Sequence, residues 1–129
     1  MSNINDFVIE DGNLLEYNGN DNNVVIPDDG SVTSLGDGCF LWCESLESIT
    51  IPESVTSLGD DCFYYCTSLK SIEIPASVTT IGEEAFGNCT NLTDVYYTGS
   101  ASDWAKITIR ECNEDLLNAT IHYNSTMPE

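Results

Sequence analysis

The sequence predicts an α/β-type solenoid, in which short coils of chain stack along one axis. Three consecutive segments, 26–50, 51–73 and 74–96, each begin with Ile-Pro and align with a period of 23 residues. The first segment departs from the period only by two extra residues near 28–31, which fit a bulging loop. A repeat of this length is one supersecondary unit that buries its apolar face against its neighbours.

Each unit repeats a set of apolar columns that it cannot bury alone. The seven or eight apolar side chains of one unit stabilise it by less than the conformational entropy that ordering 23 residues costs. Stacked units bury their apolar faces against each other, and the exposed apolar faces at the two ends of the stack then need caps. In the second unit the columns are Val55, Leu58, Gly59, Phe63, Cys66, Leu69 and Ile72.

One short strand and one short helix are expected in every coil. The segment 46–51 alternates, so that Ile49 and Ile51 would face the core while Ser48 and Thr50 face outward. A proline then ends the strand, because it cannot donate to a continuing ladder. After a turn at glycine, the acidic start and apolar spacing of DDCFYYC predict a short helical turn on the opposite side.

The flanking segments predict caps, and the whole chain 1–129 is expected to be one domain with three repeats at 26–96. Asp11-Gly12 lies between two apolar runs and predicts a β-hairpin within the cap 1–25. In the cap 97–129, Ser102 and Asn113 are expected to start two short helices before a last strand. Trp104 is expected to plug the core.

The repeats resemble those of the BspA-like leucine-rich repeat family, which run as IPxSVTxIGxxAFxxCxxLxxIx. The match is close over 26–96, and the flanks are similar to the opening hairpin and closing segment of such chains. The resemblance implies a right-handed solenoid with one parallel strand per repeat. It also implies a surface or secreted protein, bacterial or protist, that binds other macromolecules.

The charge restricts the class of partner. Twenty-two acidic residues face three basic ones, for a net charge of −19. Such a surface repels nucleic acid and anionic membrane, so we expect a protein partner, in particular a basic one, and a monomeric chain. The start MSNINDFVIE lacks the basic and apolar regions of a secretory signal, which favours the cytoplasm by default although the family is often surface or secreted.

Cysteines occur as CxxxC pairs in the first two units, at 39 and 43 and at 62 and 66. In the third unit Ala85 takes the place of Cys39 and Cys62, which favours a small packing residue over a metal ligand. Disulfides between stacked coils, Cys39–Cys62 or Cys43–Cys66, and a zinc site among these four cysteines remain alternatives.

Other polar residues receive structural interpretations. His122, the one histidine, lies in the last expected strand, and no catalytic, phosphate-binding or cofactor-binding motif accompanies it. We therefore expect no enzyme, no cofactor and no resident metal. The acidic residues that open the turn segments are expected to cap helix starts, with a calcium-binding ladder as the alternative; they are Asp37, Asp60, Asp61, Glu83 and Glu84.

Two surfaces are candidates for partner binding. The strand face, which by resemblance is the concave, ligand-binding side, presents Ser48, Thr50, Ser71, Glu73, Asp94 and Tyr96. The opposite side presents Leu41, Trp42, Tyr64 and Tyr65, where the third unit has Gly87-Asn88. These aromatic residues either pack into the core or form an exposed interface. The sequence predicts a non-catalytic protein-binding module of the adhesion or host-interaction type; the alternative is an acidic inhibitor or decoy of a basic protein, such as a nucleic-acid-binding one.

Overall fold

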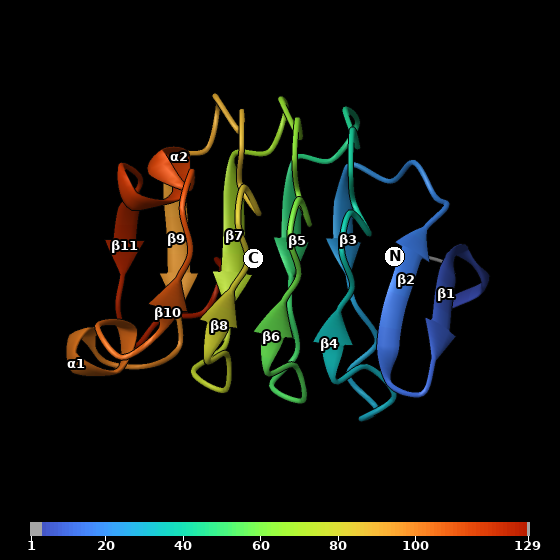
Figure 1. Cartoon of the computed structure of the whole chain (residues 1–129), viewed down its shortest axis with the longest axis horizontal. Helices are drawn as coiled ribbons and strands as arrows, with labels where there is room; N and C mark the ends of the chain where they lie inside the picture. The colour runs from blue at the N-terminus through green and yellow to red at the C-terminus, as the bar shows by residue number, and fades with distance from the viewer. Residues whose placement is uncertain (1–3, 129) are drawn as a thin grey trace.

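The computed structural model describes residues 4–128, which form a β-solenoid with two sheets along its length (Figure 1). One sheet, sheet B, has the strand order β11-β9-β7-β5-β3, and the other, sheet A, the order β1-β2-β4-β6-β8-β10. The elements are η1 (Ile4–Asp6), β1 (Phe7–Glu10), β2 (Asn13–Tyr17), β3 (Asn23–Val25), β4 (Ser34–Leu35), β5 (Ser48–Thr50), β6 (Ser57–Leu58), β7 (Ser71–Ile74), β8 (Thr80–Ile81), β9 (Asp94–Tyr97), α1 (Ala101–Trp104), β10 (Thr108–Ile109), α2 (Glu114–Leu117) and β11 (Thr120–His122).

The strands of sheet B are parallel and in the register that the 23-residue period requires. Ile49 of β5 pairs with Ile72 of β7, which pairs with Val95 of β9, and all three side chains are buried. Each coil also adds a second, two-residue strand to sheet A, which was not expected. Leu58 of β6 pairs there with Leu35 and Ile81 of its neighbours.

The segments between sheet A and sheet B are stacked turns, and the helical turns expected there are not formed. In the second unit, the amides of Tyr64 and Cys66 donate to carbonyls three residues earlier, as in successive turns. The amides of Asp61, Phe63 and Tyr65 instead donate to the next coil, at distances of 2.7–3.0 Å. Because alternate amides are used between coils, a continuous helix is impossible. These turns form the upper edge in Figure 1.

Two of the acidic residues that open the turns, Asp37 and Asp60, link coils through their side chains instead of capping helices. Asp37 Oδ1 accepts from the Asp60 amide at 2.9 Å, and Asp60 Oδ1 accepts from the Glu83 amide at 2.8 Å. The coils approach so closely here that a Cβ at Gly82 would lie 2.5 Å from the Asp60 amide nitrogen. This close approach explains why the column holds glycine in every unit.

A ladder of aromatic rings runs through the core. Successive ring centroids are 5.2 Å apart from Phe7 through Tyr17, Phe40 and Phe63 to Phe86. All five side chains are buried. The N-terminal hairpin of β1 and β2 thus contributes two rings to the same stack as the repeats. It is antiparallel, and β2 continues sheet A by parallel pairing with β4.

Of the two helix starts expected near the C-terminus, the first is shifted, and the second lies at Asn113 as expected but without a side-chain cap. Helix α1 begins after Ser100, not Ser102, since Ser100 and Asp103 form a reciprocal capping box. Asn113 precedes α2, but its buried side chain bonds elsewhere: Oδ1 accepts from the Phe86 amide, and Nδ2 donates to the carbonyls of Gly82 and Arg110. Trp104 is half-buried and packs edge-on against Tyr97. Within residues 4–128, no helix is long and apolar enough to cross a bilayer.

Candidate functional site

The strand face carries the predicted outward residues in two straight rows. Ser48, Ser71 and Asp94 are register partners in one row, and Thr50, Glu73 and Tyr96 in the other. The rows continue to Asn23 and Val25 on β3 and to Thr120 and His122 on β11. All six predicted side chains are half-buried. The structure therefore places them together on one surface, the outer face of sheet B.

A polar pair lies at the C-terminal end of this strand face. His122 Nε2 is 2.8 Å from Asp94 Oδ1, and the imidazole stacks on the Tyr96 ring with centroids 4.6 Å apart. Thr93 Oγ1 donates to the other carboxylate oxygen at 2.8 Å. The hydrogen bond from His122 and that from Thr93 hold the pKa of Asp94 below its usual value. The arrangement fixes two side chains, and among residues 4–128 no nucleophile is hydrogen-bonded to the histidine.

The C-terminal segment crosses the strand face and covers part of it, which the sequence did not indicate. After β11 the chain turns back toward β7 (Figure 1), and the Ser125 amide donates to the Tyr97 carbonyl at 3.0 Å. The Met127 amide donates to Glu73 Oε1 at 2.7 Å, and the Met127 sulfur lies 3.9 Å from Ser71 Oγ. Two of the six predicted residues on this face, Ser71 and Glu73, are thus in contact with the C-terminal segment.

The aromatic cluster of Leu41, Trp42, Tyr64 and Tyr65 lies on the opposite side, on the stacked turns. Leu41 is 45% exposed and Trp42 is 55% exposed, while the two tyrosines are half-buried. The Trp42 and Tyr65 rings stack with centroids 4.4 Å apart, and Tyr64 meets both rings edge-on at 6.5 and 5.0 Å. The cluster is therefore a surface of mutually packed rings, separate from the buried ladder.

The backbone under this cluster is strained for aromatic residues. Trp42 has a φ of 60° and Tyr65 a φ of 61°, both in the left-handed region. A bulky residue there is an outlier, whereas asparagine tolerates the conformation. The third unit places Asn88 at the same point of the turn, with a φ of 55°. Two of the three units therefore carry a large ring where the turn favours a small polar residue.

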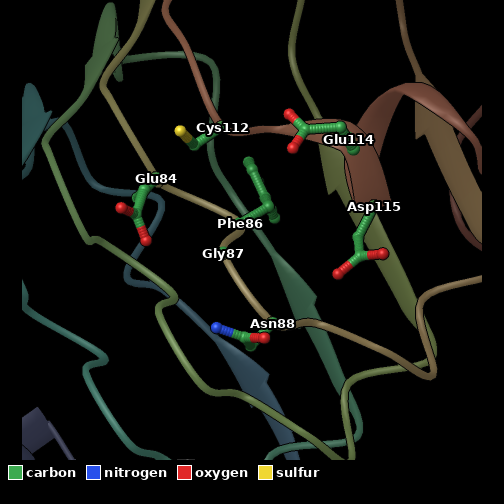
Figure 2. Close-up of a pocket in the computed structure, with 7 residues that line it drawn as sticks. All are labelled: Glu84, Phe86, Gly87, Asn88, Cys112, Glu114 and Asp115. Carbon is green, nitrogen blue, oxygen red and sulfur yellow. The ribbon is translucent and has the colours of Figure 1, made fainter.

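A pocket of about 230 Å³ adjoins the cluster over the third unit (Figure 2). Phe86 and Gly87 line it in the middle, and the side chains of Glu84, Glu114 and Asp115 surround it. Gly87 stands where the second unit has Tyr64, and a Cβ at Gly87 would lie 2.7 Å from the Tyr64 ring. The absence of a side chain at Gly87 therefore leaves room for the Tyr64 ring, which lies beside the pocket.

The negative potential of this pocket acts on an exposed cysteine at its rim. Desolvation and the carboxylates of Glu84 and Glu114 raise the pKa of the Cys112 thiol. The sequence singled out only Glu84, as a helix cap or alternatively as a calcium ligand, and neither Glu114 nor Asp115. The nearest sequence signal is the change from Tyr64 to Gly87 in one column, whereas Glu114 and Asp115 follow the last of the three repeats, where no column places them.

The remaining cysteines pack as part of the structure. Cys39, Cys62, Cys66 and Cys89 are buried, as is Ala85, which replaces Cys39 and Cys62 in the third unit. Burial is the main cause that raises the pKa of Cys89 to about 12. All six cysteines are free, with the Cys39 and Cys62 sulfurs 3.5 Å apart, and the described residues contain no group of three histidine, cysteine or acidic side chains placed to hold a metal.

Comparison with known proteins identifies the family. Residues 12–127 match the model of the BspA type leucine rich repeat region, in six copies. The chain belongs to this family. The BspA-type match takes in most of the segments that we assigned to the two caps.

Solved bacterial leucine-rich repeat proteins share the fold. The chain is 28% identical to a leucine rich cell surface protein from Faecalibacterium prausnitzii, with a TM-score of 0.60 over 91% of this chain and 36% of that one. It is 25% identical to a leucine-rich repeat protein from Bacteroides capillosus, with a TM-score of 0.69 over 91% of both chains. This BspA-type chain thus spans about a third of the first protein and most of the second. No curated protein matches it.

Proposed function

We propose that this BspA-type chain is a non-catalytic protein-binding module of the adhesion or host-interaction type, and that its partner binds the aromatic cluster. The observation that carries the proposal is the pairing of exposure and strain at Trp42 and Tyr65. Large rings are kept at positions where they are exposed or half-exposed and where the backbone disfavours them. Tryptophan and tyrosine are also the residues that contribute most at protein interfaces.

The fold itself does not require the cluster. The third unit has Gly87-Asn88 in place of two of these residues, and Asn88 keeps the left-handed φ of the turn. The Gly87 carbonyl accepts from the Tyr65 amide just as the Tyr64 carbonyl accepts from the Trp42 amide. The strand face is the weaker candidate, because the C-terminal segment covers Ser71 and Glu73. The uncovered part near Thr50 forms a groove of about 260 Å³, which also touches Thr126 of that segment.

A second candidate function is an acidic inhibitor or decoy that occupies a basic protein. The net charge of −19 supports it, since a field of this size attracts a basic partner from a distance. The two functions differ in the response of binding to salt. A decoy that acts through its charge weakens steeply as salt is raised, whereas an interface centred on packed aromatic rings changes little.

The test is a capture experiment with matched variants. The immobilised wild type is compared with Trp42→Asn/Tyr65→Asn, whose asparagines match Asn88, and with Ser48→Ala/Thr50→Ala on the strand face. We expect a protein that binds to the wild type and to Ser48→Ala/Thr50→Ala, the strand-face variant, but not to Trp42→Asn/Tyr65→Asn, the turn variant. A protein lost only by the strand-face variant would overturn the choice of surface.

A further inference from the structure

We propose that the partner presents an arginine side chain, which binds over Tyr64 and directs its guanidinium into the acidic pocket beside Gly87. The inference rests on the proposed function for the choice of surface and adds the chemistry of the ligand. The site joins two features that touch each other: the exposed rings of the aromatic cluster, and the pocket lined by Glu84, Glu114 and Asp115 (Figure 2).

Contact between the two features is direct. A Cβ placed on Gly87 would lie 2.7 Å from Tyr64 Cδ1 and 3.0 Å from Glu84 Oε2. Tyr64 and Glu84 therefore both lie against Gly87, which lines the pocket. A guanidinium in the pocket beside Gly87 would lie near both the Tyr64 ring and the Glu84 carboxylate, which is the combination that stabilises a bound guanidinium.

The pocket has negative charge that the chain does not neutralise. Among the described residues, the ion pairs are Lys106 with Asp103 and His122 with Asp94, and neither lies at this site. Beside the larger effect of desolvation, Glu84 and Glu114 also help to raise the pKa of the adjoining Cys112 thiol. A ligand that complements this site is positively charged.

Size and shape favour arginine over other cations. The pocket of about 230 Å³ is smaller than the roughly 300–1,000 Å³ of sites for drug-sized ligands, so it suits a single side chain. Tyr64 supplies a flat aromatic surface beside it. Guanidinium is planar, stacks on aromatic faces and bonds carboxylates bidentately, while the lysine ammonium is a compact, strongly hydrated charge.

The experiment uses the full chain and synthetic glycine peptides that carry arginine, lysine or citrulline at alternate positions. Binding is measured by calorimetry at low and at physiological salt. We expect the arginine peptide to bind about tenfold more tightly than the citrulline peptide and more tightly than the lysine peptide. Tyr64→Leu removes the ring and should weaken arginine binding about fivefold, and Tyr64→Phe, which keeps it, should not.

A matched pair of charge variants separates the site from general attraction. Glu84→Gln and Glu53→Gln each remove one negative charge, the first in the pocket and the second on the other side of the coil. Arginine binding should fall about fivefold in Glu84→Gln and stay within about twofold in Glu53→Gln. Circular dichroism of each variant checks that the fold is retained.

Several outcomes would overturn the inference. Equal losses in the two charge variants, or equal binding of arginine and lysine peptides, would show diffuse attraction to an acidic surface. An arginine peptide that binds no more tightly than the citrulline peptide would show that the positive charge is not recognised. If the capture experiment still finds a protein that depends on Trp42 and Tyr65, the proposed function stands and only the arginine chemistry is wrong. If arginine binds as expected but no such protein is found, the proposed function fails instead.

Discussion

Replacing Trp42 by glycine should leave the protein more stable than replacing it by alanine. Both substitutions remove the ring and its stacking on Tyr65, so the difference between them isolates the backbone. The φ of Trp42 is 60°, a left-handed value that costs a residue with a Cβ roughly 1–2 kcal/mol. Glycine avoids this cost, but it lowers the free energy of unfolding by about 0.4–1 kcal/mol because it gives the unfolded chain more conformations. The expected net difference is about 1 kcal/mol in favour of glycine.

Leu41 provides the matched control. It belongs to the same exposed cluster and directly precedes Trp42, but its φ is not positive. Only the unfolded-state effect then operates, so Leu41→Ala should be more stable than Leu41→Gly by about 0.4–1 kcal/mol. The order of the two substitutions is therefore expected to reverse between neighbouring residues.

Urea denaturation followed by circular dichroism measures the free energies of unfolding of these four variants. Equal slopes of the free energy against urea concentration confirm that the four transitions are comparable. Trp42→Ala as stable as Trp42→Gly would refute the idea that the aromatic residues are held on a strained backbone. The same order at both positions would refute it equally. In either case the retention of Trp42 and Tyr65 would need no functional explanation.

Three further predictions test other parts of the structure. Phe63→Ala, which breaks two contacts in the buried ladder, should lower the free energy of unfolding by about 3–5 kcal/mol in the same assay, and a loss below about 1 kcal/mol would contradict the ladder. His122→Ala should raise the pKa of Asp94 in an NMR titration, and an unchanged pKa would exclude the pair. Because the pKa of Asp94 is lowered in the folded state, the pair stabilises the fold at pH values above the ordinary carboxyl pKa. This contribution is lost as the pH falls through the lowered pKa. Cys112 should be the first cysteine to react with a thiol reagent, and its reaction rate should still rise above neutral pH because its pKa is raised. Cys112→Ser should remove this fast reaction, while the buried thiols react only on unfolding.

The repeat columns and the register were predictable because one period governs them. Ile49, Ile72 and Val95 recur every 23 residues, and parallel stacking pairs them without any other information. The spacing of Cys62, Phe63 and Cys66 fits a helical turn as well as a stacked turn. What separates the two is the hydrogen bonding of alternate amides to the next coil, which a pattern within one unit does not display.

The candidate site was predictable only in part. The aromatic cluster stood out because Leu41-Trp42 and Tyr64-Tyr65 contrast with Gly87-Asn88, and the structure places three of these rings in mutual contact. The strain beneath them follows from backbone angles that the sequence does not state. The cover over the strand face comes from residues after the last repeat, and their docking depends on tertiary contacts with Glu73 and Tyr97.

The most direct test of the central claim is the affinity of a captured partner for the Trp42→Asn/Tyr65→Asn variant, measured by calorimetry beside the wild type. If the aromatic cluster is the centre of the interface, the affinity should fall at least about 30-fold, equivalent to roughly 2 kcal/mol. The Ser48→Ala/Thr50→Ala variant should remain within about twofold of the wild type. An unchanged affinity in the turn variant, or a large loss confined to the strand-face variant, would contradict the assignment of binding to the stacked turns.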